Sequence, residues 1–228
     1  MTMKHNTDRI SIQVGLSGYS FKIEADGKEH SSGWMSADRI FTTLEFQKRY
    51  SEVEISVFTP KCTLVPAQFH SPEISAKLLS EVVRLDADDT VAHVDIPELG
   101  SVLVYSNIIG ETLSKVISET VMTVHGQKTA PLPEMYYMLK SLSDLEEYNK
   151  IVASYVDGIL YLVIAQGRTL LLCNTYKALD FTTAEYFIFL AMKKLQLNPE
   201  MSTITFRTPL DEEEEISLYR YFKNVDII

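Results

Sequence analysis

Alternating apolar and polar positions open the chain and predict strands before any helix. Residues 10–14 alternate, residues 15–18 read as a turn, and residues 19–25 form a second alternating run. Asp26-Gly27, a dipeptide that favours tight hairpin turns, closes this run. The sequence therefore begins with a predicted β-hairpin. Further predicted strands lie at about residues 54–58, 63–65, 90–96 and 102–105, the last two as a hairpin, and a new series begins at about residue 148.

Apolar residues at helical spacing predict the helices. The stretch Thr182-Thr183-Ala184-Glu185 has the pattern of a capping box, and the apolar helix that it begins should end near Leu197, before Asn198-Pro199. Ser71-Pro72-Glu73 combines a polar cap with a proline at the first helical position and predicts another helix start. The apolar residues of that helix should share one face: Ile74, Leu78, Val82 and Leu85. Other helical patterns cover residues 38–50, 109–117 and part of 124–144.

An internal repeat gives the best guide to the domain organisation. The stretch Phe21-x-Ile23-x-Ala25-x-Gly27-Lys28 recurs as Tyr161-x-Val163-x-Ala165-x-Gly167-Arg168, and the preceding glycines Gly18 and Gly158 keep the same offset of 140 residues. Any two hairpins share alternation and a turn glycine, so the alternative is a chance match. We predict an internal duplication, with one α/β half in residues 1–143, including the joining segment, and a second half in residues 144–228.

Composition and charge exclude several classes of protein. The 228 residues are 46% hydrophobic and 23% charged, which is typical of a globular chain, and the net charge of −10 argues against nucleic-acid binding. The longest apolar stretch, residues 151–164, contains Ser154, Asp157 and Gly158, so membrane insertion is not expected. The amino terminus is polar, and Cys62 and Cys173 lack metal-type spacing. We expect free thiols and a cytoplasmic protein.

Three stretches carry a family resemblance: Leu64-Val65-Pro66-Ala67-Gln68-Phe69, Leu170-Leu171-Leu172-Cys173-Asn174-Thr175-Tyr176 and Tyr219-Arg220-Tyr221-Phe222-Lys223-Asn224-Val225. On these the chain resembles an uncharacterised bacterial family with an actin-like ATPase fold. The two hairpin-led halves are similar to the superfamily of actin, sugar kinases and heat-shock chaperones. The resemblance implies α/β architecture with two ribonuclease-H-like halves, and it implies no activity. Members of that family are somewhat longer, so the strand-like end at residues 225–228 leaves a truncated second half as an expectation.

In that superfamily the first turn of each half wraps the nucleotide phosphates, and an Asp-x-Gly-[Thr/Ser] motif supplies an acid for the metal. Here the first turn is Gln13-Val14-Gly15-Leu16-Ser17-Gly18, so Gln13 replaces the acid. The second is Ala153-Ser154-Tyr155-Val156-Asp157-Gly158, in which Tyr155 stands where a small residue is expected. We therefore predict a vestigial nucleotide site without catalytic residues, metal or cofactor, with bound ATP and Mg²⁺ as the alternative. Its candidate residues are Gln13, Gly15, Ser17, Gly18, Asp157 and Gly158.

The remaining polar and aromatic features have simpler structural interpretations. His93-x-Asp95 should form a solvated strand face, because a metal site normally needs three or more ligands. His125 has no evident Ser or Cys partner, and Asp211 to Glu215 should form an acid-rich first helical turn. Trp34 is expected to pack at the core or an edge, with anchoring of a partner as the alternative. Tyrosines gather near the join and the carboxyl terminus, at Tyr136, Tyr137, Tyr148, Tyr186, Tyr219 and Tyr221.

Two functional hypotheses follow. The favoured one is a non-catalytic interaction or regulatory protein that keeps the fold, has lost the ATPase and binds a protein partner. The rival is a nucleotide-binding ATPase or phosphotransferase of the actin and sugar-kinase type, with Gln13 and Asp157 in an unusual metal shell.

Overall fold

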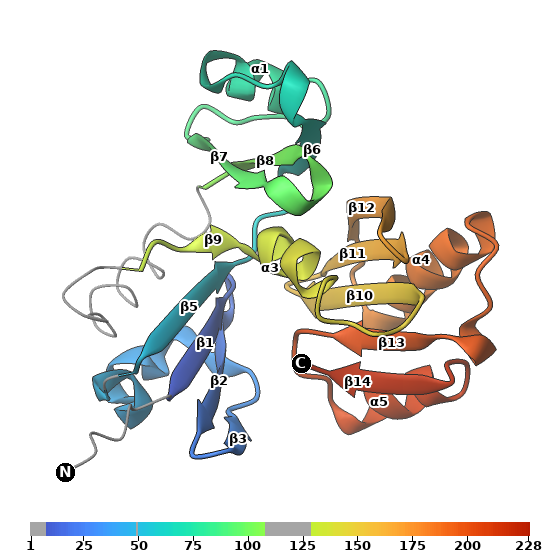
Figure 1. Ribbon diagram of the computed structural model, residues 1–228. Coiled ribbons are helices and arrows are strands. Elements are labelled where there is room, and N and C mark those ends of the chain that lie inside the picture. The colour runs from blue at the N-terminus through green and yellow to red at the C-terminus, as the bar shows by residue number, and fades with distance from the viewer. Residues whose placement is uncertain (1–7, 49, 108–128) are drawn as a thin grey trace, which may run out of the picture. The chain divides into compact units, whose positions relative to one another are not determined.

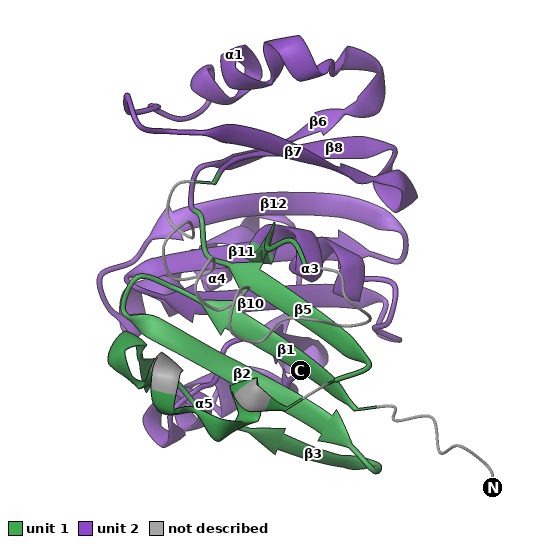
Figure 2. Ribbon diagram, turned by 90° about the vertical axis from the view of Figure 1, so that its left-hand side faces the viewer, with its two compact units in different colours: residues 1–59, 107–134 green, residues 60–106, 135–228 purple. Residues whose placement is uncertain are grey.

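The computed structural model describes residues 8–48, 50–107 and 129–228. The chain divides into two compact units, which Figure 2 distinguishes by colour. Unit 1 comprises residues 1–59 and 107–134, and unit 2 comprises residues 60–106 and 135–228. The helix predicted at 109–117 and His125 lie outside the described residues.

Unit 1 is built on one mixed sheet of order β3-β2-β1-β5-β9, with β4 also paired to β2 (Figure 1). Strand β1 is antiparallel to β2 and parallel to β5, and β5 is parallel to β9. Alternate residues of β1, Ile10 and Ile12, are fully buried beside Phe21 and Phe46, as the period of two predicts. The strands are β1 Arg9–Val14, β2 Gly18–Ala25, β3 Lys28–Ser31, β4 Met35–Ser36, β5 Glu52–Val57 and β9 Leu132–Pro133.

The single helix predicted at 38–50 is wrong, because two 3-10 helices occupy this stretch: η1 Ala37–Thr42 and η2 Leu44–Gln47. They are separated by Thr43, which has extended backbone (φ −75°, ψ 108°). The Thr43 hydroxyl is buried, lies 2.5 Å from the Tyr19 hydroxyl and donates to the carbonyl of Arg39. A tertiary contact of Thr43 therefore accompanies the break in a pattern that reads as one continuous helix.

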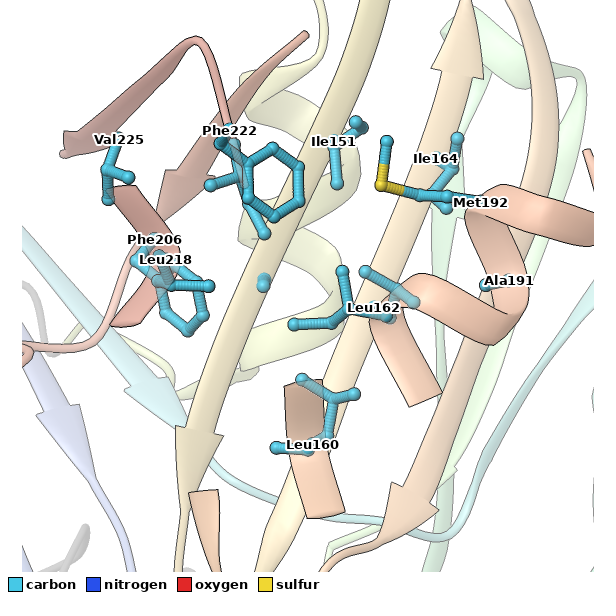
Figure 3. Close-up of a cluster of buried hydrophobic side chains, with 14 of the residues drawn as sticks. Ile151, Leu160, Leu162, Ile164, Ala191, Met192, Phe206, Leu218, Phe222 and Val225 are labelled. Carbon is cyan, nitrogen blue, oxygen red and sulfur yellow. The ribbon is translucent and has the colours of Figure 1, made fainter. Parts of the chain in front are cut away.

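The main sheet of unit 2 has the order β12-β11-β10-β13-β14. Strand β10 is antiparallel to β11 and parallel to β13, so this sheet repeats the strand order and directions of the unit 1 sheet. Helices cover one face of it over an apolar core that includes Leu162, Met192 and Phe206 (Figure 3). The elements are β10 Asn149–Val156, β11 Ile159–Gln166, β12 Thr169–Lys177, β13 Thr203–Phe206, β14 Asn224–Ile227, α3 Glu134–Ser141, α4 Phe181–Lys194, η6 Pro199–Met201 and α5 Glu212–Tyr219.

The boundaries of the helices in this unit differ in part from the sequence pattern. Helix α4 begins at Phe181, because the Asp180 side chain accepts from the Thr183 backbone N–H at 2.7 Å, so the predicted cap at Thr182 is wrong. Helix α5 has the predicted acid-rich first turn, and Asp211 and Glu214 form a capping box. Within the described residues, no helix is both long enough and apolar enough to cross a bilayer.

Residues 60–106 add a small antiparallel sheet of order β6-β8-β7. Helix α1 packs on it through Leu79, next to Val65 and Val104. The predicted hairpin is confirmed as β7 and β8, whose turn ends at Gly100 with φ 57°. Its elements are β6 Cys62–Pro66, η3 Ala67–Phe69, η4 Pro72–Ile74, α1 Ser75–Ser80, β7 Val91–Ile96, η5 Pro97–Leu99 and β8 Ser101–Ser106.

The helical face predicted for residues 74–85 is wrong at Ile74 and Val82, whereas Leu78 and Leu85 do pack against the apolar cluster. The segment starts as the 3-10 turn η4 and becomes α-helical only at Ser75, ending at Ser80. A 3-10 turn rotates side chains by a larger angle per residue than an α-helix, so the buried face shifts. Ser75 and Leu79 are consequently buried, whereas Ile74 and Val82 are exposed.

An ion-pair cluster joins the ends of this small sheet. Lys61 Nζ donates to Asp86 Oδ2 at 2.7 Å and to Asp89 Oδ2 at 2.6 Å, while the Ser106 hydroxyl donates to Asp89 Oδ1. The Asp89 side chain is only 1% exposed. These donors lower the pKa of Asp89 to about 2, with the Lys61 hydrogen bond as the largest cause.

Candidate functional site

The first turn of unit 1 connects β1 to β2 through residues 15–17. The Gly15 backbone N–H donates to the carbonyl of Gly18 at 2.9 Å, so this amide is already used inside the turn. Leu16 is 68% exposed, and the hydroxyl of Ser17 accepts from Trp34 Nε1 at 3.0 Å. The Trp34 ring packs edge-on against Phe58 at 6.1 Å between centroids. The predicted packing role of Trp34 is therefore confirmed.

Gly18 is required by a close approach of two backbones. It begins β2 and pairs with Ser36 of β4. A Cβ added at Gly18 would lie 1.9 Å from the carbonyl oxygen of Met35, far inside contact distance. The need at Gly18 is thus for space beside β4.

Gln13 belongs to a buried hydrogen-bond network. Its Nε2 donates to Glu134 Oε1 at 3.1 Å, and its Oε1 accepts from the Ser20 hydroxyl at 3.0 Å. The Ser56 hydroxyl donates to the other carboxylate oxygen, Glu134 Oε2. Gln13 is 6% exposed and Glu134 is 0% exposed. A neutral amide at position 13 therefore supplies a donor that a buried carboxylate needs.

The network lies at the carboxyl ends of the parallel strands, where ligands of open α/β folds usually bind. Strands β1, β5 and β9 are parallel, and their carboxyl ends are followed directly by Gly15, Phe58 and Glu134, respectively. Thr59 adds a buried hydroxyl, 2% exposed, that has no hydrogen-bond partner among the residues that the structure describes. In chemical terms this end of the sheet holds one buried carboxylate, already bonded to Gln13 and Ser56, and one hydroxyl without a partner in the described part of the chain.

Sequence reasoning missed Glu134, Ser20 and Ser56. Ser20 in β2 donates to Gln13, and Ser56 in β5 donates to Glu134. Nothing in the alternating pattern of a strand distinguishes these serines from other polar residues. Glu134 is 121 residues from Gln13 along the chain. The sequence feature that could have indicated Glu134 is its position, directly after Pro131-Leu132-Pro133 and at the start of helix α3.

The corresponding turn of unit 2 is shorter and tighter. Asp157 and Gly158 have φ of 52° and 71°, and Val156 pairs directly with Ile159, which defines a two-residue hairpin turn. By contrast, Gly18 starts a strand, so the two glycines of the 140-residue offset occupy different conformations. A Cβ on Gly158 would meet the carbonyl oxygen of Ala178 at 3.5 Å.

Tyr155 lies two residues before this turn and is held by neighbouring segments of unit 2. Its hydroxyl donates to the carbonyl of Ala178 at 3.0 Å, its backbone N–H donates to Thr208 Oγ1 at 3.0 Å, and its ring packs on Phe181. Desolvation raises the pKa of Tyr155, with smaller contributions from Asp180 and Glu214. Of the six predicted site residues, Gln13, Gly15, Ser17 and Gly18 thus lie in unit 1, and Asp157 and Gly158 lie in unit 2.

The other candidate residues mostly take the structural roles expected of them. His93 and Asp95 are exposed on one face of β7, although the ring of His70 lies next to His93. Cys62 and Cys173 are free thiols, and desolvation raises the pKa of Cys62 and raises that of Cys173 to about 12. Within residues 8–48, 50–107 and 129–228, no three His, Cys, Asp or Glu side chains form a group suited to a metal ion.

Comparison with known proteins gives the family. A family model described as "Protein of unknown function (DUF3822)" matches residues 4–225. The chain belongs to this family. No curated protein matches the sequence.

Solved structures similar to this family member share its fold. A Bacteroides thetaiotaomicron protein with an actin-like ATPase fold and unknown function aligns with a TM-score of 0.63 at 16% identity, covering 100% of this chain and 94% of that chain. A chain of the PilM-PilN type IV pilus biogenesis complex aligns with a TM-score of 0.52 at 11% identity, covering 96% and 88%. The chain therefore has an actin-like ATPase fold, and the sequence-based prediction of this fold is confirmed.

Proposed function

We propose that this protein is a non-catalytic interaction or regulatory protein in which an actin-like fold has kept its sheets and lost its nucleotide chemistry. The observation that carries the proposal is the bond from Gln13 Nε2 to the buried Glu134 carboxylate. Metal-dependent phosphate chemistry needs carboxylate oxygens that can face Mg²⁺. Here the acid of the first turn is replaced by an amide, and Glu134 is fully buried with donors on both oxygens.

The two turns support the same proposal. Phosphate-binding turns direct free backbone N–H groups at the ligand. The Gly15 N–H donates within its own turn, and the second turn has only Asp157 and Gly158 between paired strands. Neither arrangement favours the wrapping of a phosphate group.

A protein partner is the occupant that fits such a scaffold. The PilM-PilN complex contains a chain of the same fold assembled with another protein, which is a precedent for the fold and no more. Exposed leucines stand beside both turns: Leu16 is 68% exposed, and Leu179, next to Gly158, is 93% exposed. We further propose that the two halves arose by duplication, because their sheets share one strand order, and that the protein works in the cytoplasm, where free thiols persist.

The nucleotide part of the proposal is tested by thermal denaturation with millimolar ATP or ADP, with and without Mg²⁺. A ligand at a hundredfold excess over its dissociation constant stabilises the folded state by about 2.7 kcal/mol. We expect no Mg²⁺-dependent shift and no ATP turnover. Turnover that is abolished in Gly15→Trp, which blocks the first turn, would overturn the proposal.

The partner part is tested by cross-linking in the native host, followed by purification of the wild-type chain and of Leu16→Asp and Leu179→Asp. We expect one partner protein to be recovered in stoichiometric amount, and at least one of these changes to lower the amount recovered. The melting temperature should stay constant because both side chains are exposed. A chain recovered alone would contradict partner binding.

The rival function, a nucleotide-binding ATPase or phosphotransferase, has one observation in its favour. The Thr59 hydroxyl is buried at the carboxyl end of β5 and has no hydrogen-bond partner within the described ranges, and a bound ligand could satisfy it. If a Mg²⁺-dependent nucleotide shift occurs and Thr59→Val diminishes it, this edge is a working ligand site.

A further inference from the structure

Three segments of unit 2 meet at one end of its helices. Helix α4 is followed by η6, and the turn after α5 lies against η6, since the Lys223 backbone N–H donates to the carbonyls of Pro199 at 3.2 Å and Ser202 at 3.1 Å. The same turn contacts α4, because the ring centroid of Tyr221 lies 4.9 Å from that of Phe189. The fold therefore brings residues 193–202 and 220–223 together at the carboxyl ends of α4 and α5.

These segments are basic. Residues 193–202 and 220–223 carry four cations and one acid: Lys193, Lys194, Arg220 and Lys223, and Glu200. Lys193, Arg220 and Lys223 are exposed, and none of them forms an ion pair with an acid among the residues that the structure describes. The helix dipole favours a cation at the end of α4, but Arg220 and Lys223 lie beyond the last turn of α5, which holds no basic residue.

Apolar side chains are exposed beside these cations. Met201 of η6 and Tyr221 both lie on the surface, and the Tyr221 ring packs edge-on against the half-buried Phe189. This contact restrains the tyrosine ring, so covering it with a partner costs little further conformational entropy. Tyrosine, methionine and arginine are enriched at protein interfaces. The surface thus offers both apolar contacts and charge to a partner.

The charge of this surface is opposite in sign to the net charge of the chain. The net charge is −10, and the other ends of the two helices are acidic, with Asp180 capping α4 and four glutamates in the first turn of α5. Salt screens exposed charges beyond about 8 Å at physiological ionic strength. A short acidic segment at this surface therefore interacts mainly with the cations, whereas a wide anionic membrane would also face acidic parts of the chain.

We propose that this basic surface docks an acidic segment of a protein partner, in which Asp or Glu side chains flank an apolar anchor. The carboxylates pair with the exposed cations, and the anchor covers the exposed apolar side chains. The basic surface comprises Lys193, Arg220, Lys223, Met201 and Tyr221. The inference rests on the proposed function in taking the occupant to be a protein, and it does not involve Leu16 or Leu179.

The test selects peptides from a random library displayed on phage, with the full chain immobilised. We expect the enriched peptides to carry clustered Asp or Glu residues next to an aromatic or aliphatic one. Synthetic copies should bind at least about tenfold more weakly when Arg220→Glu and Lys223→Glu are combined, because each reversal replaces an attraction by a repulsion. Added NaCl should weaken their binding to the wild-type chain.

Arg168→Glu combined with Lys177→Glu is the matched control. It changes the net charge equally, at two exposed cations of the same unit that lie next to or in β12. This variant should bind the peptides as the wild-type chain does, and the melting temperatures of both double variants should match that of wild type because the four side chains are exposed. Tyr221→Ser should also weaken binding, which a purely electrostatic attraction would leave unchanged.

Several results would overturn the inference. They are a failure to enrich acidic peptides, unchanged binding in the charge-reversed variant, and an equal loss in the control. Binding to vesicles of phosphatidylcholine and phosphatidylserine that disappears in the charge-reversed variant also overturns it, since the occupant is then a membrane. Backbone nitrogen-15 NMR separates the two proposals: peptide-induced shifts at Leu179 rather than Tyr221 contradict this surface and leave the proposed partner binding intact.

Discussion

Introducing an acid at position 13 should destabilise the protein. In Gln13→Glu, a second carboxylate replaces the amide that donates to Glu134 Oε1 at 3.1 Å. The change removes one hydrogen bond to a charged group, worth about 1.5–3 kcal/mol, and sets two buried acids against each other. The variant should therefore be strongly destabilised at neutral pH.

The size of the effect follows from the separation. Two unit charges at the 3.1 Å distance of the Gln13–Glu134 bond repel by about 5 kcal/mol at an effective dielectric constant of 20. Uptake of a proton by one of the two acids limits this cost. We expect Gln13→Glu to lose about 3–5 kcal/mol of unfolding free energy at pH 8, in the range for a broken buried charge interaction.

Urea denaturation between pH 5 and pH 8 measures the effect. The loss relative to wild type should shrink as the pH falls, because a protonated carboxyl group at position 13 can donate to Glu134 as the amide does. Gln13→Met, which removes the donor without adding charge, should lose about 1.5–3 kcal/mol with a weaker pH dependence. A loss under 1 kcal/mol in Gln13→Glu, constant over this pH range, would refute the buried network.

Three further changes probe other parts of the fold. Gly18→Ala should lower the melting temperature by several degrees, because its Cβ would lie 1.9 Å from the carbonyl oxygen of Met35. Gly27→Ala meets no neighbouring atoms but has a φ of 72°, so it measures the cost of backbone strain without a clash. Asp89→Asn should lower the unfolding free energy at neutral pH and make it less dependent on pH below pH 4. The pKa of Asp89 falls from 3.8 to about 2 in the folded state, so the stabilisation by its carboxylate is lost as the pH falls through that window. Burial raises the pKa of Glu214 above its ordinary value of 4.5, so the contribution of Glu214 to the unfolding free energy should decrease as the pH rises above 4.5. Glu214→Gln, which can keep the capping box, should remove this part of the pH dependence in urea melts.

The sheets could be predicted from sequence because their information is local. The alternation at 10–14 and 19–25 predicted β1 and β2, and the repeated motif at 161–168 predicted that the second half would also open with a β-hairpin, which is β10 and β11. The parallel partners β5 and β13 follow in each unit in the same order. The alternation of a strand depends only on residues that are close along the chain, so it can be recognised without knowledge of the tertiary structure.

The helices were harder to predict because their faces depend on where each one starts. The 3-10 turn η4 shifts the buried face of the next helix onto Leu79, and Thr43 divides another helical pattern in two. The sequence pattern placed the start of α4 at Thr182, whereas the Asp180 carboxylate caps the helix. Each error concerns a local choice that a tertiary contact or a competing cap decides.

The candidate site could be located but not completed. The resemblance directed attention to Gln13, and the sequence correctly showed an amide in place of an acid. Its partner Glu134 comes from the beginning of helix α3, and no periodicity links the two positions.

Exchanging the two side chains decides whether position 13 alone separates this protein from a nucleotide-binding one. In Gln13→Glu combined with Glu134→Gln, the amide at 134 can donate to the new acid and accept from Ser56, so we expect at least half of the lost stability to return. The new acid would still be buried, because Gln13 is only 6% exposed. The exchanged protein should therefore regain stability without a Mg²⁺-dependent ATP shift in thermal denaturation. A clear shift there, absent from the wild-type protein, would mean that the identity of residue 13 controls nucleotide binding and that the burial of the site does not exclude it.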